Sequence, residues 1–289
     1  MHPLISTDEL AAANDEPTRR PWLRLYDTTQ HLRPSAQGGF AVESAAADHA
    51  QAHLPGAAYL DLQRDLSDNA SALRFTLPSV PQLEAAFGKA GMADGLEVVL
   101  YSSTSPMWAT RIWWMLKSLG FAARVLDGGL ARWQAEGRPV ETGDVRHSGA
   151  RFTARPQPGH WADKDEVLRA IGNGDVCTIN ALTASVHAGT APVHYGRPGH
   201  IAGSVNVPFP SLQQADGRLK PVDELRAAFA DSGAFGKARA ICYCGGGIAA
   251  TMTALALHLG GHPDVAVYDA SLQEWAAQPE LPMAVGPAG

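Results

Sequence analysis

Cysteine is scarce in this sequence: three residues among 289. Cys242 and Cys244 are separated by a single residue, and Cys177 stands alone. This number and spacing fit neither a disulfide framework nor a four-ligand zinc site. We therefore expect free thiols, no bound metal and a reducing compartment.

Positive charge and long apolar runs are scarce as well. The 23 Lys and Arg residues are scattered and are outnumbered by 29 Asp and Glu residues, which gives a net charge of −6. This balance predicts that nucleic acid is not a partner. No apolar run is as long as a membrane span, and residues 1–20 have no hydrophobic centre of the kind that an export signal needs. We expect no membrane partner and a cytoplasmic location.

What the sequence does contain is a repeat. The length, with 45% hydrophobic residues, predicts two domains of ordinary size. The same order of strand, turn, helix and acidic turn occurs in each half. The matching pairs are 23–27 with 176–180, 53–57 with 197–204, the helix ending at Phe87 with 224–229, and 126–133 with 267–275.

Strands that alternate with helices predict the α/β class, with a mainly parallel sheet flanked by helices in each half. A stretch containing Pro and Gly, residues 139–159, separates the two copies. We therefore predict two domains, residues 1–145 and 160–289.

The most informative stretch lies in the second copy. A short apolar strand reaches Tyr243, the loop Cys244-Gly245-Gly246-Gly247 follows, and an Ala- and Leu-rich helix ends near Gly260. Such a loop can direct several N–H groups and the positive end of a helix dipole at one sulfur atom, which favours the thiolate. Cys244 is therefore the predicted nucleophile. The alternative interpretation is a buried cysteine beside a tight turn. The backbone predicted to cradle the sulfur is that of Gly245, Gly246, Gly247, Ile248 and Ala249.

The first copy lacks this thiol. Its loop runs from Ser102 to Pro106, and counting back from the following helix puts Ser103 where Cys244 stands. We therefore expect the first domain to be catalytically inactive and to supply one wall of a cleft.

Three further motifs accompany residues 243–250. Two are histidine-and-glycine turns, at 52–57 and 199–204, and the third is 268–275 near the C-terminus. Together these motifs resemble the rhodanese superfamily, in particular its tandem-domain sulfurtransferases, which include the thiosulfate and 3-mercaptopyruvate enzymes. The resemblance covers nearly the whole chain and implies two tandem rhodanese-like domains. It also implies that Cys244 takes a sulfane sulfur from a small donor, holds it as a persulfide and passes it to a thiol, cyanide or thioredoxin-like acceptor, without a cofactor.

The departures from that pattern concern the donor. Gly245 and Gly246 stand where the thiosulfate enzymes have basic residues, and Gly246 also stands where the mercaptopyruvate enzymes have serine. Phe75 replaces a histidine of the mercaptopyruvate enzymes, and Leu182 and Val186 replace two arginines that grip the mercaptopyruvate carboxylate. The remaining substrate-binding candidates are Asp61, in the segment that carries the family's aspartate, and Arg197, His194 and His187, which are near in sequence. For Asp61 a turn-stabilising role is the alternative, and for Arg197 a solvated loop position.

Two other functions fit parts of this pattern. A cysteine phosphatase shares the strand, loop and helix, but it needs an arginine that clasps phosphate, and Ala249, Ala250 and Thr251 occupy that region. The second is a non-catalytic persulfide carrier or sulfur-sensing module that acts with a protein partner. The missing arginines, serine and histidine keep this second function open.

Overall fold

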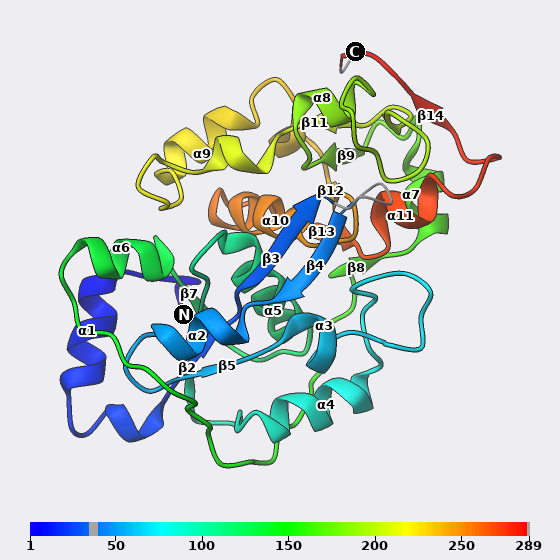
Figure 1. The fold of residues 1–289 in the computed structure, drawn as a ribbon. Coiled ribbons are helices and arrows are strands. Elements are labelled where there is room, and N and C mark those ends of the chain that lie inside the picture. Colours follow the sequence, from blue (N-terminus) through cyan, green and yellow to red (C-terminus); the bar gives the residue numbers. More distant parts are fainter. Residues whose placement is uncertain (35–39, 288–289) are drawn as a thin grey trace.

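The computed structural model describes residues 1–34 and 40–287, and residues 35–39 and 288–289 lie outside the described part. Its two halves each contain a five-stranded parallel sheet (Figure 1). The first has the order β1-β7-β6-β2-β5, made of Leu4–Ile5, Ala123–Leu126, Glu97–Tyr101, Leu23–Asp27 and Ala57–Tyr59. The second has the order β8-β13-β12-β9-β11, made of Trp161–Ala162, Val265–Tyr268, Arg239–Tyr243, Val176–Asn180 and Val205–Asn206. Every strand thus has a counterpart at the same place in the other sheet, which confirms the predicted α/β tandem repeat.

Helices flank both sheets. Those of the first half are α1 (Thr7–Asp15), α2 (Ala46–Gln51), α3 (Leu62–Asp65), α4 (Val80–Lys89), α5 (Pro106–Ser118) and α6 (Gly129–Ala135). Those of the second half are α7 (Lys164–Ala170), α8 (Ala184–His187), α9 (Val222–Ala228), α10 (Ala249–Leu259) and α11 (Ser271–Trp275). Short 3₁₀ turns occur at Arg20–Trp22, Phe209–Leu212 and Ala234–Gly236, and β10 (His200–Ile201) pairs with β14 (Met283–Ala284).

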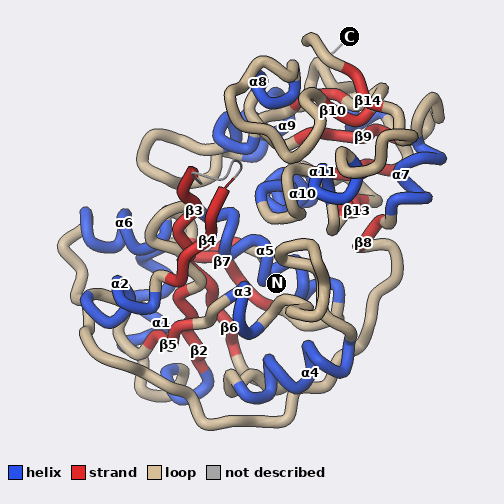
Figure 2. The backbone as a smooth tube through the Cα atoms, turned by 45° about the vertical axis from the view of Figure 1, so that its right-hand side comes forward, coloured by secondary structure: helices blue, strands red, loops and turns tan. Residues whose placement is uncertain are grey.

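One element of the first half has no counterpart in the described part of the second. The antiparallel strands β3 (Gln30–Pro34) and β4 (Phe40–Ser44) follow β2. In the second half the corresponding strand β9 is followed by α8 instead. Figures 1 and 2 show that β3 and β4 rise from the first half toward the second. This pair therefore brings Phe40 toward the second half.

Helices α5 and α10 join the two halves. The side chains of α10 from Ala249 to Leu257 are all buried, and α5 is buried at nearly every position. Helices that are apolar all round lie inside a core, not on a surface. The hydroxyls of Thr110 and Thr251, at matching places in the two helices, lie 2.8 Å apart. The main hydrophobic core is accordingly continuous across both halves.

The segment between α6 and β8 contains no helix or sheet strand. It packs along the first half, where its backbone bonds to His53, Gly88 and Leu119. We propose to divide the chain along this segment into the domains 1–145 and 160–289.

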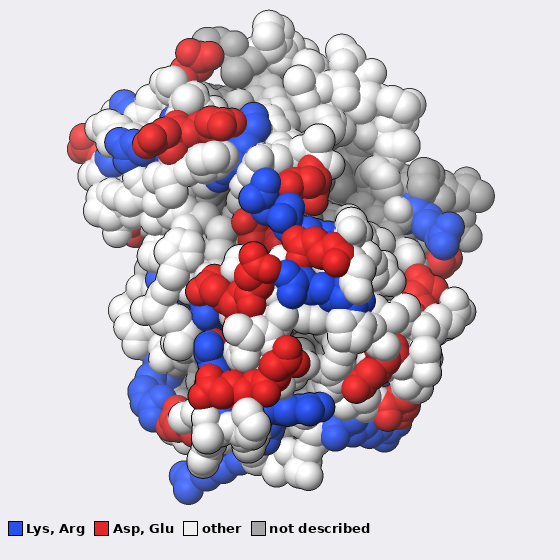
Figure 3. All heavy atoms as spheres, turned by 90° about the vertical axis from the view of Figure 1, so that its left-hand side faces the viewer, with Lys and Arg blue, Asp and Glu red and all other residues white. Residues whose placement is uncertain are grey.

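The surface in Figure 3 carries Lys, Arg, Asp and Glu side chains interspersed with one another. No large area of that face has a single sign of charge. Within the described ranges, no helix combines the length and the apolar character that crossing a bilayer requires.

Candidate active site

Cys244 lies at the C-terminal end of a central strand. β12 is paired on both sides, with β9 and β13, and Cys244 follows its last residue directly. The chain then turns through Gly245–Ile248 and enters α10. The carboxyl edge of a parallel sheet is where α/β folds place their ligand sites. The Cys244 side chain is only 2% exposed, so this thiol lies beneath a cover.

Ser271 holds both ends of the loop. Its hydroxyl accepts hydrogen bonds from the backbone N–H groups of Cys244 and Gly247, at 3.1 Å each, and donates to the carbonyl of Tyr268 at 2.7 Å. The N–H of Leu272 also donates to the Cys244 carbonyl at 3.1 Å. The turn between β13 and α11 therefore fixes the shape of the cysteine loop.

The predicted cradle divides into two kinds of amide. Among the described residues, the N–H groups of Gly245, Gly246, Ile248 and Ala249 have no hydrogen-bond acceptor. The N–H of Gly247 instead donates to Ser271. The free amides stand at the start of an eleven-residue helix, where donors and the helix dipole both favour an anion. They are available to a charged sulfur, whereas the Gly247 amide shapes the loop.

Position 247 in the loop accepts only glycine without strain. Its φ angle is +74°, and a Cβ atom there would lie 2.4 Å from the carbonyl oxygen of Asp269. A non-glycine residue would combine left-handed backbone strain with a clash.

An arginine of the first half anchors the cysteine loop through a backbone carbonyl. Arg111, on α5, is fully buried and donates to the carbonyl of Gly247 at 3.1 Å. It also donates to a carboxylate oxygen of Asp269 at 2.5 Å and to the carbonyl of Phe75 at 2.8 Å. The second Asp269 oxygen accepts from the N–H of Leu77 at 2.8 Å. Because the peptide is planar and trans, holding the Gly247 carbonyl toward Arg111 turns the Ile248 N–H to the opposite side.

Aromatic side chains cover the loop. A Cβ atom at Gly245 would lie 2.1 Å from the ring of Tyr195, so that ring rests directly on the loop backbone. The ring of Phe40, at the start of β4, lies 5.8 Å from the Tyr195 ring. Burial raises the pKa of Tyr195 well above its usual value, and the nearby Cys244 raises it further. The Tyr195 hydroxyl therefore stays protonated at neutral pH.

The side chain of Gln273 and the backbone of Arg74 close the other side of the cysteine loop. Gln273, on α11, accepts from the N–H of Arg74 at 3.2 Å and donates to the Arg74 carbonyl at 2.7 Å. A Cβ atom at Gly246 would lie 3.1 Å from Nε2 of this glutamine. The guanidinium of Arg74 donates to the Phe40 carbonyl. We call Phe40, Arg74, Tyr195 and Gln273 the rim of the site.

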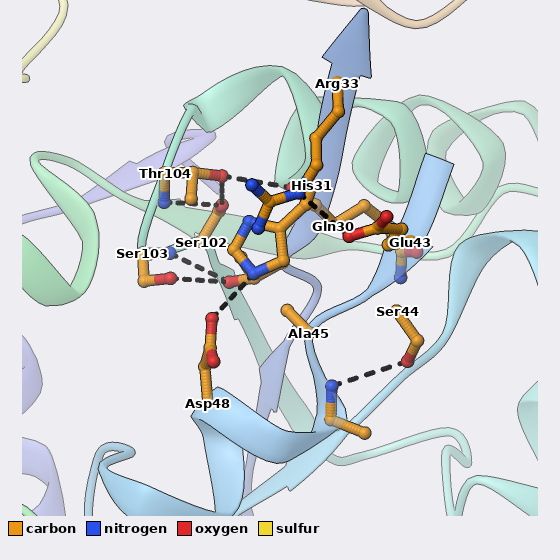
Figure 4. A network of polar contacts seen from close by, with 12 residues as sticks. Gln30, His31, Arg33, Glu43, Ser44, Ala45, Asp48, Ser102, Ser103 and Thr104 are labelled. Atoms are coloured by element: carbon orange, nitrogen blue, oxygen red, sulfur yellow. Dashed lines mark hydrogen bonds and ion pairs between the residues drawn. The ribbon is translucent and has the colours of Figure 1, made fainter. Parts of the chain in front are cut away.

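The loop of the first half has the same framework without the thiol. The N–H of Leu130 donates to the Ser102 carbonyl at 3.3 Å, as that of Leu272 does to Cys244. Counted from the strand, Ser102 is the equivalent of Cys244. Counted from the helix, Ser103 is, because this loop is one residue longer. The N–H and hydroxyl of Ser103 contact the Thr29 hydroxyl at 2.9 and 3.2 Å, within the polar network of Figure 4.

The predicted substrate-binding residues have different surroundings in the structure. Asp61, 4% exposed, accepts the N–H of Arg64 at 3.0 Å and caps α3 in the first half. The Arg197 guanidinium donates to five carbonyls between Trp275 and Leu281. His194 is half-buried beside Tyr195, and its buried Nδ1 has no partner among the described residues. Arg197 thus helps to hold the C-terminal segment in place.

Each half also contains a stacked histidine pair. The rings of His187 and His200 lie 3.7 Å apart, and those of His49 and His53 lie 4.2 Å apart. His200 and His53 each bond to the backbone carbonyl of their partner, at 2.7 and 2.8 Å. Burial, with His200 nearby, lowers the pKa of His187 to about 4. In each half, these contacts tie the histidine-and-glycine turn to the preceding helix, α2 or α8.

Sequence reasoning missed Ser271, Arg111 and Arg74. Ser271 lies within the motif 268–275, so its place after a strand was visible in the sequence. Arg111 is a charged residue in an otherwise apolar helix segment, which is a signal for a buried partner. Arg74 had no sequence signal of its own, because its neighbours at the site are 34 and 199 positions away.

Comparison with known proteins gives the family. The model of the rhodanese-like domain matches residues 32–136 and again 183–278. Rat thiosulfate sulfurtransferase is 32% identical over 294 residues, with 99% of this chain and 96% of the relative covered. Rat 3-mercaptopyruvate sulfurtransferase is 30% identical over 284 residues, covering 96% and 93%. The crystal structure of SseA from Escherichia coli matches with a TM-score of 0.81 and 29% identity, over 94% of this chain and 99% of that one. The chain therefore belongs to the rhodanese-like family, carries two tandem copies of its domain, and is a sulfurtransferase similar along nearly its whole length to the thiosulfate and 3-mercaptopyruvate enzymes.

Proposed function

We propose that this chain moves a sulfane sulfur from a small donor of the thiosulfate or 3-mercaptopyruvate type to a thiophilic acceptor, through a persulfide on Cys244. The observation that carries this proposal is the placement of one thiol at the end of a central strand, beside backbone amides that have no acceptor among the described residues. Preorganised donors of this kind stabilise charge without a cofactor.

The steps balance without an external oxidant or reductant. The Cys244 thiolate attacks the outer sulfur of the donor and forms an S–S bond, giving the persulfide. With thiosulfate the sulfur–sulfur bond of the donor breaks and sulfite leaves. With 3-mercaptopyruvate the carbon–sulfur bond breaks and pyruvate leaves after protonation of its enolate. The acceptor then attacks the outer sulfur, and the Cys244 thiolate leaves. The free amides of Gly245, Gly246, Ile248 and Ala249 would hold the charge on sulfur in each state.

The proposed acceptors are a low-molecular-weight thiol, cyanide or a thioredoxin-like protein, each of which carries a nucleophile toward sulfane sulfur. We place this activity in the cytoplasm, where reducing conditions keep such a thiol free. Asp61 and His194 stay as proposed contributors to donor binding. Arg197 would contribute only if its bonds to the C-terminal segment were exchanged.

The rate of thiocyanate formation from thiosulfate and cyanide tests this proposal directly. Cys244→Ser is expected to abolish thiocyanate formation, because the hydroxyl is not ionised at neutral pH and cannot carry the sulfur. Cys177→Ser is the matched control, since this thiol lies on β9 and bonds to the Ser232 carbonyl at 3.6 Å. Equal rates for Cys244→Ser and the parent protein would contradict the assignment of the nucleophile.

A persulfide carrier is the second candidate, and one observation favours it. Cys244 is 2% exposed, and the rim residues Tyr195 and Gln273 lie against the neighbouring Gly245 and Gly246, which suits a sulfur that is handed only to a partner able to open the site. Counting thiocyanate per protein chain separates the two functions. Many equivalents indicate turnover, whereas a single equivalent that requires a protein acceptor for further rounds indicates a carrier.

A further inference from the structure

The donors proposed above carry negative charge, but the cysteine loop has no cation to receive it. From Cys244 to Ala250 there is neither Lys nor Arg. Arg111 is buried and already bound to Asp269 and to two carbonyls. The Arg197 guanidinium already bonds to five carbonyls of the C-terminal segment. The cysteine loop itself therefore offers an anionic donor amide groups but no cation.

The rim contains one cation. Its four members are Phe40, Arg74, Tyr195 and Gln273, of which only Arg74 is charged. The backbone of Arg74 is fixed by two hydrogen bonds to Gln273, whose amide lies against Gly246. The residue is therefore positioned by the second half, although it belongs to the first.

The side chain of Arg74 is exposed and keeps spare donors. It donates to the Phe40 carbonyl, and it forms no ion pair within the part of the chain that the structure describes. A guanidinium has five N–H donors in a planar fork, which suits sulfonate and carboxylate groups. Phe40 in turn contacts Tyr195, which rests on Gly245. An anion bound at Arg74 would thus lie beside the residues that pack against Gly245 and Gly246 of the cysteine loop.

We infer that Arg74 binds the anionic group of the sulfur donor at the entrance to Cys244 and so sets the preference of the site for sulfonate or carboxylate donors. This inference rests on the proposed function and extends it to the recognition of the donor.

Steady-state kinetics with Arg74→Gln provide the first test. Gln keeps the backbone bonds to Gln273 and removes the charge. We expect the KM for thiosulfate and for 3-mercaptopyruvate to rise by about tenfold or more, the size of one lost charge-assisted contact, with kcat nearly kept. Arg74→Lys should recover part of the loss. Arg64→Gln is the matched control, because Arg64 is an exposed arginine that pairs with its neighbour Asp65, and it should leave KM unchanged.

Alkylation of Cys244 tests Arg74 without any sulfur transfer. Iodoacetate and iodoacetamide share a leaving group and differ in charge, so the ratio of their rates reports the electrostatic potential at the entrance. We expect Arg74→Gln to lower this ratio by about tenfold at low salt, with the iodoacetamide rate kept, and Arg64→Gln to leave it unchanged. An unchanged ratio and unchanged KM in Arg74→Gln would overturn the inference. If the parent protein formed no thiocyanate while the ratio still fell, the proposed function would fail and the anion site would stand.

Discussion

At the scale of single residues, the three cysteines show that the same side chain has different properties in different surroundings. Burial raises the pKa of Cys242 well above the usual value, and it raises that of Cys177 to about 11. Cys242 is fully buried in β12, and Cys177 lies in β9. Cys244 alone among them stands on a loop beside amides that have no acceptor among the described residues. Nearness in the sequence does not reveal this difference, because Cys242 and Cys244 are only two positions apart.

This division predicts selective labelling. At pH 7.5 iodoacetamide is expected to modify Cys244 and to leave Cys177 and Cys242 unmodified. A thiol pKa raised from 9 to about 11 reduces the thiolate fraction about 100-fold. Peptide mass mapping after a short reaction measures the sites. Labelling of Cys177 as fast as that of Cys244 would contradict the prediction, and Cys244→Ser, which should take up no label, is the control.

At the scale of elements, α5 of the first half contributes to the structure of the cysteine loop in the second half. Its Arg111 reaches the loop that precedes α10 and holds the Gly247 carbonyl, while Asp269 takes the other side of the guanidinium. The first half, whose own loop at 102–106 has no thiol, therefore supplies a structural part of the candidate site. A buried ion pair that also anchors backbone groups is costly to break on one side, because the remaining charge stays unpaired.

Arg111→Met tests this role. We expect the free energy of unfolding to fall by about 3 to 5 kcal/mol, since Asp269 would be left without its partner. Sulfur transfer should fall together with it, because the Gly247 peptide loses its anchor. Urea unfolding followed by tryptophan fluorescence is a suitable measurement, given Trp108, Trp113 and Trp114 on the same helix.

The double variant Arg111→Met, Asp269→Asn is the matched comparison. It removes the unpaired carboxylate, so part of the lost stability should return. Activity should not return, because the Gly247 carbonyl still has no donor. A single variant as stable as the parent protein would rule out an anchoring role for this ion pair.

At the scale of the whole molecule, buried histidines couple stability to pH. Burial lowers the pKa of His187 and of His258 to about 4, with further contributions from His200 and from Lys117 respectively. His187 belongs to the stacked pair of the second half, and His258 lies on α10 with its ring 5.9 Å from that of Trp113 of α5. Their protonation therefore acts on the second half and on the junction of the two halves.

The free energy of unfolding is expected to fall as the pH is lowered from 7.5 to 5.5. The unfolded chain takes up protons on these histidines near pH 6.5, while the folded chain does so only near pH 4, so acid favours unfolding over this range. Urea midpoints at the two pH values measure the change. His187→Gln should show a smaller difference between them. Equal midpoints for the parent protein at both pH values would contradict the prediction.

The sequence by itself determined the repeat, the two parallel sheets and the place of the cysteine loop. Each of these depends on patterns within short stretches: apolar strands, helix spacing and glycines beside a thiol. The match of 126–133 with 267–275 is part of the repeat that predicts one α/β unit in each half, whereas the order of the strands in the two sheets came from the structure.

Only the tertiary structure decided what surrounds the thiol. Arg74 and Gln273 are 199 positions apart, and Arg111 and Asp269 are 158 apart, so their contacts arise only when the two halves share one core. Arg197 shows the reverse case, since its nearness in sequence suggested donor binding, whereas folding turned its guanidinium toward the carbonyls of the C-terminal segment. Local sequence determines whether a residue lies in a strand, a loop or a helix. The direction of a long charged side chain depends instead on which acceptors the packed chain brings within its reach.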